Sequence, residues 1–310
     1  MAAKRILLIA NPASGQHRGE RRLAQASERL ASLGHAVTGT LTESAGHATR
    51  LAKSNAPDFE IIAALGGDGT VNEVANGLMA VEPGERPALA TLPVGTGNDV
   101  ALTYGLAHFE SAIDALAKGS TRTLDVIRVQ LMRDGKSVTR HALLFVAAGF
   151  AAEVIRKTGP RVKRIFGRRF SYSVGLFRAL ASFRAPEFSV KWDGGETSGR
   201  MFQVCAGNTE FAAGGVMRIS PGARPDDGLL NISLVDVLGR LQIVRRFPSI
   251  LSGRYVEDER VDYFTGKRLE IDAVPPAEFQ ADGDIIGTTP ATVELLPGAL
   301  QLVVHDQFQV

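Results

Sequence analysis

The segment Ile61-Ile-Ala-Ala-Leu-Gly-Gly-Asp-Gly-Thr-Val-Asn-Glu73 gives the clearest indication of fold in this 310-residue chain. Ile61 to Leu65 is a short continuous apolar run, as expected of a strand that is buried on both faces. The glycine-rich turn Gly66–Thr70 follows, and the residues from Val71 to Met79 are expected to form a helix. A buried strand, a glycine-rich turn and a helix in this order are typical of a parallel α/β sheet, which binds ligands at the carboxyl ends of its strands.

The same alternation extends outward over the first third of the chain. Apolar runs and helical spacing of leucine and alanine predict strands at 6–10, 36–41 and 88–92, and helices at 20–33 and 45–54. Two further turns rich in glycine and small residues, Asn11–Gly15 and Pro93–Asp99, come directly after predicted strands. The sequence therefore predicts an α/β class protein whose N-terminal domain is a doubly wound sheet with three turns at one edge.

From about Asp125 onward, short strand patterns separated by turn residues replace this alternation. They indicate a mostly antiparallel C-terminal β-sandwich. We expect domains at 1–127 and 128–310, with a return of the last ~25 residues to the first domain as an alternative. The predicted strands are 125–131, 137–147, 188–192, 201–206, 229–237 and 268–273, and the predicted helices are 168–183 and 241–251, the second containing Pro248.

Composition excludes several classes of protein. Apolar residues make up 45% and charged residues 22% of the chain, an ordinary globular balance, and a formal charge of +2 is too small to favour nucleic acid as a partner. The single cysteine, Cys205, excludes an internal disulfide and fits a reducing compartment. The apolar run near the N-terminus is too short for a signal peptide, and no stretch approaches the roughly 20 apolar residues of a membrane span. We expect a cytoplasmic protein that meets lipid, if at all, peripherally at the inner face of the membrane.

The turn Gly66-Gly-Asp-Gly-Thr-Val-Asn-Glu73 has the composition of a phosphate-binding loop. Glycines let bare backbone amides approach an anion, at a cost in conformational entropy. Asp68 beside that anion requires a metal ion or a proton-transfer role to compensate its charge. The loop matches neither the Walker A pattern nor the dinucleotide fingerprint. A purely structural turn is the alternative.

The other three candidate stretches have structural alternatives as well. Asn11–Gly15 could be an ordinary strand-to-helix turn. In Pro93–Asp99, Thr96 and Asn98 can donate to phosphate or ribose, although Asn98 or Asp99 could instead cap the next helix. Gln280-Ala-Asp-Gly-Asp284 places two acids around a glycine, a pattern that is also common in hairpin turns.

Together these four stretches resemble the diacylglycerol kinase catalytic-domain family, which includes bacterial lipid kinases and sphingosine and ceramide kinases. The family pattern is Asn-Pro-x-Ser/Gly-Gly, Gly-Gly-Asp-Gly-Thr-x-Asn-Glu, Pro-x-Gly-Thr-x-Asn-Asp and a late Asp-Gly-Glu, and all four occur here in order. The resemblance covers nearly the whole chain. It also includes Thr42 with Gly46–Ala48, Asn208, and the stretch Pro221–Leu229.

The resemblance implies an NAD-kinase/diacylglycerol-kinase-like α/β domain, a C-terminal sandwich, and an active site in the cleft between them. It implies an ATP- and Mg²⁺-dependent lipid kinase of phospholipid biosynthesis that phosphorylates a hydroxyl of diacylglycerol or a related lipid alcohol. It further implies a Mg²⁺ site in which Asp227 supplies a carboxylate and Arg224 and Leu229 supply backbone carbonyls. The matching nucleotide-site residues are Asn11, Thr42, Gly66, Gly67, Asp68, Gly69, Thr70, Val71, Asn72 and Thr96.

One position departs from the family pattern. The late motif usually ends in Glu, whereas position 284 is Asp, one methylene shorter. The general base for the hydroxyl proton is therefore expected among Asp282, Asp284 and Asp68, with the 282/284 pair favoured and Asp68 assigned to the nucleotide-bound metal.

A basic stretch suggests a membrane contact. Residues 156–169 contain seven cations and no acid, and an apolar-rich helix is expected next, at 170–180. This combination suits docking on an anionic leaflet, although a solvated cationic face beside a core helix is the alternative.

Two other functions remain open from the sequence. An NAD kinase also carries a Gly-Gly-Asp-Gly-Thr loop, but would be expected to lack the matched Pro93–Asp99 and Asp282–Asp284 segments. A non-catalytic nucleotide- or lipid-binding regulator is the other alternative, with Asp284 as the only feature in its favour. The lipid acceptor and a homodimeric state are not encoded in any readable motif.

Overall fold

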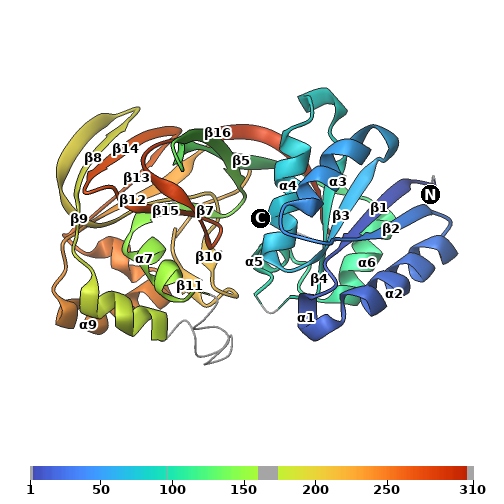
Figure 1. Ribbon diagram of the computed structural model, residues 1–310, viewed down its shortest axis with the longest axis horizontal. Helices are drawn as coiled ribbons and strands as arrows, with labels where there is room; N and C mark the ends of the chain where they lie inside the picture. The colour runs from blue at the N-terminus through green and yellow to red at the C-terminus, as the bar shows by residue number, and fades with distance from the viewer. Residues whose placement is uncertain (1–2, 96, 160–173, 306–310) are drawn as a thin grey trace. The chain divides into compact units, whose positions relative to one another are not determined.

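The computed structural model describes residues 3–95, 97–159 and 174–305, which form two compact units (Figure 1). Unit 1 comprises Met1–Val126, Phe211–Gly215 and Pro297–Val310, and unit 2 comprises Ile127–Glu210 and Val216–Leu296. The expected boundary at 127/128 puts residues 211–215 in the second domain, whereas in the structure this short segment packs with unit 1. Its contact with Asp99, described below, accounts for the difference.

Unit 1 contains a parallel sheet in the order β4-β3-β1-β2. The end of the long strand β16 pairs in parallel with β4 through Leu302 and Leu89. The chain leaves β1 for β2 on one side and then crosses to β3 on the other, so the topological switch point lies between β1 and β3. The strands are β1 (Arg5–Ala10), β2 (Ala36–Leu41), β3 (Ile61–Gly66) and β4 (Ala88–Pro93).

Helices cover both faces of this sheet (Figure 1). Apolar residues of α2 and α6 pack in one cluster with Ile6, Leu8 and Leu65 of the strands. Helices α3 and α4 pack against each other, and a Cβ atom on Gly77 would lie 2.7 Å from Ala52 Cβ. The elements are α1 (Ser14–His17), α2 (Gly19–Ser32), α3 (His47–Asn55), η1 (Ala56–Asp58), α4 (Asp68–Met79), η2 (Pro83–Glu85), α5 (Asp99–Thr103), α6 (Phe109–Lys118) and β10 (Phe211–Ala212).

Unit 2 is a two-layer antiparallel β-sandwich around an apolar core that includes Phe188, Phe279 and Val293. The long strand β9 pairs with β8 through residues 195–200 and with β12 through residues 201–207, so each half of this strand has a different neighbour. The strands are β5 (Thr121–Arg133), β6 (Lys136–Ala142), β7 (Phe145–Gly149), β8 (Glu187–Trp192), β9 (Gly195–Gly207), β11 (Met217–Arg218), β12 (Leu230–Asp236), β13 (Val261–Gly266), β14 (Arg268–Val274), β15 (Glu278–Ala281) and β16 (Asp284–Val303), of which β5 and β16 continue into unit 1.

Three helical segments pack together in unit 2: α7 (Phe150–Lys157), residues 174–182, and α9 (Arg240–Ser252). They share a small apolar cluster, and η3 (Arg254–Glu257) follows α9. The helix predicted at 241–251 is confirmed with Pro248 inside it. Residues 174–182 confirm the described part of the helix predicted at 168–183, while α7 has no counterpart in the prediction. Among the described residues, no helix is both long enough and apolar enough to cross a bilayer.

Candidate active site

Three strand-to-helix turns of unit 1 meet at the carboxyl edge of the sheet. A Cβ atom on Gly95 would lie 2.6 Å from Gly67 Cα, and one on Gly15 would lie 2.5 Å from the Val94 carbonyl oxygen. Gly15 also has a left-handed backbone, with φ at 59°. Real Cβ atoms do not approach backbone this closely, so the turns require glycine at these positions for packing. This structural requirement explains part of the glycine content that the sequence analysis attributes to phosphate binding.

Helix α4 begins at the end of β3, beside the switch point. Gly67 is its N-cap, and the Gly67 carbonyl accepts hydrogen bonds from Thr70 N at 2.9 Å and Val71 N at 3.2 Å. The first N–H groups of a helix have no acceptor within the helix and point towards its N-terminus, where the helix dipole is positive. Gly69 is exposed, and nothing lies within 4 Å of the position its Cβ would take. The start of α4 is therefore open to an anion such as a phosphate.

Two carboxylates lie beside this helix start. A Cβ atom on Gly97 would lie 2.9 Å from Asp68 Oδ2 and 4.0 Å from Asp99 Oδ2. Burial raises the pKa of Asp68, against the lowering effect of backbone N–H donors that include Val100 N at 3.2 Å. Burial, followed by repulsion from Asp68, raises the pKa of Asp99. Two half-buried acids that repel each other form a site that would be stabilised by a cation.

Asp99 also holds the segment 213–215 in place. Its Oδ1 accepts hydrogen bonds from Gly214 N at 2.5 Å and Gly215 N at 3.2 Å. From the sequence, Asp99 is expected only as a possible helix cap, and its pairing with Asp68 is not predicted. One feature of the sequence does indicate that Asp99 lies near Asp68. Asp99 follows closely after the Gly95-Thr-Gly97 turn, and parallel strands bring such turns to the same edge of the sheet.

The predicted nucleotide residues of unit 1 that the structure describes lie at neighbouring strand ends, after β1, β2 and β3. Asn11 Oδ1 accepts a hydrogen bond from Ala13 N at 3.0 Å, and Thr42 N donates to Ala10 O at 2.8 Å. Asn72, in α4, receives a hydrogen bond on its Oδ1 from Asn76 at 3.0 Å. Gly66–Val71 form the end of β3 and the first turn of α4, and Thr96 lies outside the described residues.

Glu73 has a role that the sequence analysis does not assign. Its carboxylate accepts hydrogen bonds from Gly46 N at 2.9 Å and Ala48 N at 3.2 Å, at the start of α3. A carboxylate at a helix N-terminus satisfies unpaired backbone donors and interacts favourably with the dipole. Glu73 therefore fixes the segment after Thr42 to α4.

Asp282 in unit 2 is engaged by the backbone. Its two carboxylate oxygens accept hydrogen bonds from Leu143 N at 2.7 Å, Leu144 N at 3.0 Å and Phe145 N at 3.0 Å. Asn208 Nδ2 donates to the Leu143 carbonyl at 3.0 Å, so both side chains hold the same loop. Three backbone donors occupy both oxygens of this carboxylate and fix its orientation. The geometry thus gives Asp282 a positioning role.

Asp284 differs from Asp282 in its surroundings. Asp282 and Gly283 both have positive φ values, 47° and 88°, and connect β15 to β16 in the two-residue hairpin that the sequence analysis holds as the alternative. Asp284 follows at the first position of β16 and is exposed. Of the two late acids, Asp284 is exposed and Asp282 is half-buried, so Asp284 is the better candidate for a base in unit 2.

The predicted Mg²⁺ site is a turn with two exposed acidic residues, Asp226 and Asp227. Asp227 Oδ1 accepts a hydrogen bond from Leu229 N at 2.9 Å, and Asp226 forms an ion pair with Arg224 at 3.6 Å. Within the described part of the chain, no group of three or more His, Cys, Asp or Glu side chains could hold a metal ion. A hard cation here would depend on Asp227, backbone carbonyls such as those of Arg224 and Leu229, and water, a donor set that suits weak Mg²⁺ binding.

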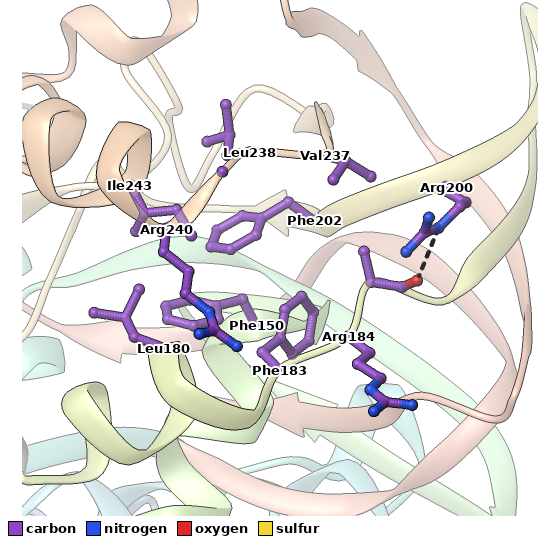
Figure 2. Close-up of a pocket in the computed structure, with 12 residues that line it drawn as sticks. Phe150, Leu180, Phe183, Arg184, Arg200, Phe202, Val237, Leu238, Arg240 and Ile243 are labelled. Carbon is purple, nitrogen blue, oxygen red and sulfur yellow. Dashed lines mark hydrogen bonds between the residues drawn. The ribbon is translucent and has the colours of Figure 1, made fainter.

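A pocket of about 210 Å³ opens within unit 2 (Figure 2). Phe150 and Phe202 stack with ring centroids 4.4 Å apart, and Phe183 contacts both rings edge-on at 5.3 and 5.5 Å. Three arginines line the pocket beside these rings, and none of the lining residues that the structure describes is acidic. The lining is Phe150, Leu180, Phe183, Arg184, Ala185, Arg200, Phe202, Val237, Leu238, Gly239, Arg240 and Ile243.

The basic stretch predicted at 156–169 is described only in its first residues. Arg156 pairs with Glu153 at 2.6 Å and with Glu278 at 3.5 Å, and Lys157 pairs with Glu153 at 3.5 Å. These two cations are therefore neutralised within the protein. Residues 160–169 of the stretch lie outside the described residues.

A parallel α/β unit whose helix α4 starts open to solvent, joined to an antiparallel sandwich, is the architecture of a class of two-domain kinases. Comparisons agree with it. Residues 5–129 match the diacylglycerol kinase catalytic domain, and residues 144–304 match the YegS C-terminal NAD kinase beta sandwich-like domain. A diacylglycerol kinase of Bacillus subtilis (strain 168) is 28% identical over 292 residues, covering 93% of this chain and 92% of that protein. The chain belongs to the diacylglycerol kinase family, with both domains in the family's order.

Solved structures support the same conclusion. A Bacillus anthracis (strain Sterne) crystal structure assigned as a diacylglycerol kinase is 27% identical with a TM-score of 0.80, covering 99% of this chain and 96% of that one. Yeast NADH kinase complexed with NADH has a TM-score of 0.51 at 11% identity, covering 98% and 84% of the two chains, which shows the fold alone. The predicted fold class is confirmed.

Proposed function

We propose that the protein is an ATP- and Mg²⁺-dependent kinase that transfers the γ-phosphate to a hydroxyl of diacylglycerol or a related lipid alcohol. The observation that carries this proposal is the pairing of an open helix start at Gly69 with two adjacent carboxylates, Asp68 and Asp99. Backbone N–H donors suit phosphate oxygens, and adjacent acids suit the metal ion that accompanies a nucleoside triphosphate.

The residues of unit 1 would bind and orient the phosphate donor. The N–H groups at the start of α4 would receive phosphate oxygens, and Asn11 and Thr42 would contact the rest of the nucleotide from the neighbouring strand ends. Asp68 and Asp99 would hold Mg²⁺, which when bound neutralises the phosphate oxygens. Asp227, with the carbonyls of Arg224 and Leu229, is proposed to hold a second, structural Mg²⁺ in unit 2.

The acceptor hydroxyl needs a group that takes its proton. We assign this role to Asp284, because it is exposed, whereas Asp282 is committed to three backbone donors. The aromatic pocket of unit 2 favours an acceptor with an apolar chain, since three phenylalanine rings offer a site that a nucleotide sugar would not fill well. Phosphorylation of such an alcohol is a step of phospholipid metabolism.

A transfer assay tests the proposal. Labelled ATP with Mg²⁺ would be supplied with diacylglycerol, ceramide, a sphingoid base and NAD in parallel, and products identified by mass spectrometry. We expect a phosphorylated lipid alcohol with the wild-type protein and none with Asp68→Ala. Phosphorylated NAD as the only product would support the NAD-kinase alternative, and ATP or lipid binding without any product would support a non-catalytic regulator.

A further inference from the structure

Helix α9 carries apolar side chains on its outer side as well as on its inner side. Ile243 is buried in the apolar cluster of unit 2, and Phe247, one helical turn further on, is half-buried. The outer side carries a stripe with spacings of three and four residues, which places its members along one face of the helix. The stripe consists of Leu241 (70% exposed), Val244 (56%), Pro248 and Leu251 (38%).

The neighbouring helical segment 174–182 has the same character. Its Gly175 and Ala179 are buried, while Phe177 on the outer side is 69% exposed. Arg240, at the start of α9, donates a hydrogen bond to the Ala181 carbonyl at 2.8 Å and so joins the two helices. Both helices also line the aromatic pocket, through Leu180 and Ile243 (Figure 2).

The charge of these segments has one sign. Residues 174–184 and 239–252 contain five arginines and no Asp or Glu: Arg178, Arg184, Arg240, Arg245 and Arg246. Arg246 is paired with Asp258. The other four are exposed and make no ion pair with any residue that the structure describes. We define the helical surface as these four arginines with Phe177, Leu241, Val244 and Leu251.

We propose that the helical surface docks on a lipid bilayer that carries anionic headgroups. Such a bilayer has a layer of phosphate headgroups above an apolar acyl region. The exposed apolar side chains of the helical surface can enter the acyl boundary, while the guanidinium groups of its arginines bind phosphate. A symmetric contact with a second copy of the chain is disfavoured, since it would bring arginines against arginines. Docking here would place the aromatic pocket, which the same helices line, next to lipid.

Vesicle co-sedimentation without nucleotide tests this inference separately from phosphate transfer. The vesicles would be phosphatidylcholine alone, or phosphatidylcholine with phosphatidylglycerol, each at low and high salt. Phe177→Ser/Leu241→Ser removes apolar contact, and Arg178→Gln/Arg245→Gln removes charge. Matched controls elsewhere on unit 2 are Val274→Ser/Met132→Ser, which are also exposed, and Arg140→Gln/Arg268→Gln, which lose the same charge.

The wild-type protein should bind anionic vesicles, and more weakly at high salt. The apolar double variant should bind about 10-fold more weakly at both salt concentrations. The arginine double variant should bind roughly 25-fold more weakly at low salt, a factor of five for each cation, with little loss at high salt. Both control variants should bind like the wild type, with unchanged melting temperatures for all four.

Three results would overturn the inference. One is that the wild-type protein remains in the supernatant when the anionic vesicles are sedimented. A second is an equal loss of binding in the control variants and the surface variants. The third is that Phe177→Ser/Leu241→Ser converts a dimer to a monomer in sedimentation velocity while vesicle binding is kept, because the surface would then be a subunit interface.

Discussion

Gly67 and Gly95 lie backbone against backbone, so that a methyl group on Gly95 would sit 2.6 Å from Gly67 Cα. The two residues belong to the turns after β3 and β4, which are adjacent parallel strands. This contact sets the distance between the start of α4 and the turn that leads to Asp99. Any bulk added between them must separate the two halves of the candidate phosphate site.

Gly95→Ala should therefore impair both folding stability and turnover. We expect a loss of about 1–3 kcal/mol in the free energy of unfolding from overpacking, and a fall of about 100-fold in kcat/KM from the displaced turns. Gly84→Ala is the matched control, because nothing lies within 4 Å of a Cβ at that position in η2. Denaturant titration and the transfer assay measure the two effects; equal behaviour of both variants would refute the packing argument.

Asp99→Asn should stabilise the protein at neutral pH while reducing activity. Burial and the charge of Asp68 raise the pKa of Asp99, so the folded state binds a proton more readily than the unfolded state. The stability that the protonated group contributes is complete below the unfolded pKa and is lost as pH rises through the folded pKa. The asparagine amide of the variant is neutral at every pH, so this stability is not lost as pH rises. Its oxygen can still accept a hydrogen bond from Gly214 N.

The measurement is the melting temperature of Asp99→Asn and the wild type between pH 4 and pH 8. The increase in melting temperature of Asp99→Asn over the wild type should be larger at pH 8 than at pH 4. A gain that is constant across this range, or that grows towards low pH, would contradict the assigned direction of the pKa shift. Added Mg²⁺ should reduce the difference in melting temperature between the variant and the wild type at pH 8, since a bound cation offsets the repulsion between Asp68 and Asp99.

The sequence predicts the elements of unit 1 well because each carries a strong local pattern. The predicted strands at 6–10, 36–41, 61–65 and 88–92 all occur, and their order brings the glycine turns together by topology alone. Unit 2 is less predictable, because its long strands β9 and β16 each pair with different neighbours along their length. The run predicted at 137–147 is interrupted between Ala142 and Phe145, where Asp282 binds the loop.

The candidate site is predicted in part for the same physical reason. Glycine and aspartate in one turn are visible in the sequence, whereas the repulsion between Asp68 and Asp99 joins two turns that are about 30 residues apart. The role of Asp282 depends on a loop of three backbone donors more than a hundred residues away, which no local pattern reveals. The pocket of unit 2 combines α9 with segments near 150, 183 and 202, which have no shared motif.

Asp282→Asn and Asp284→Asn should separate positioning from proton transfer. In Asp282→Asn the amide replaces an acceptor of backbone N–H groups by a donor, so we expect the free energy of unfolding to fall by about 2 kcal/mol. Asp284→Asn should leave stability within about 0.5 kcal/mol, because the side chain is exposed, and should lower kcat by at least about 100-fold. Full activity in Asp284→Asn would exclude it as the base.

Asp227→Asn tests the second metal site. The substitution keeps an oxygen that can accept from Leu229 N but removes the charge that favours a divalent cation. We expect the wild type, and not the variant, to show an increase in melting temperature of unit 2 on addition of millimolar Mg²⁺ without nucleotide. Asp226→Asn, whose carboxylate pairs with Arg224, serves as the neighbouring control. An equal Mg²⁺ response in wild type and Asp227→Asn would remove Asp227 from the metal site.

The central claim is that backbone N–H donors at the start of α4 hold the phosphates of ATP. The affinity for ATP with Mg²⁺, measured by isothermal titration calorimetry on Gly69→Pro and Gly69→Ala, tests it most directly. A Cβ atom at position 69 meets open space, and proline is tolerated in the first turn of a helix, but only proline removes the N–H. We predict that Gly69→Ala binds ATP with nearly the wild-type affinity and that Gly69→Pro binds it at least about 10-fold more weakly. The melting temperatures of both variants should show that they are folded. Equal affinity in the two variants would contradict the claim.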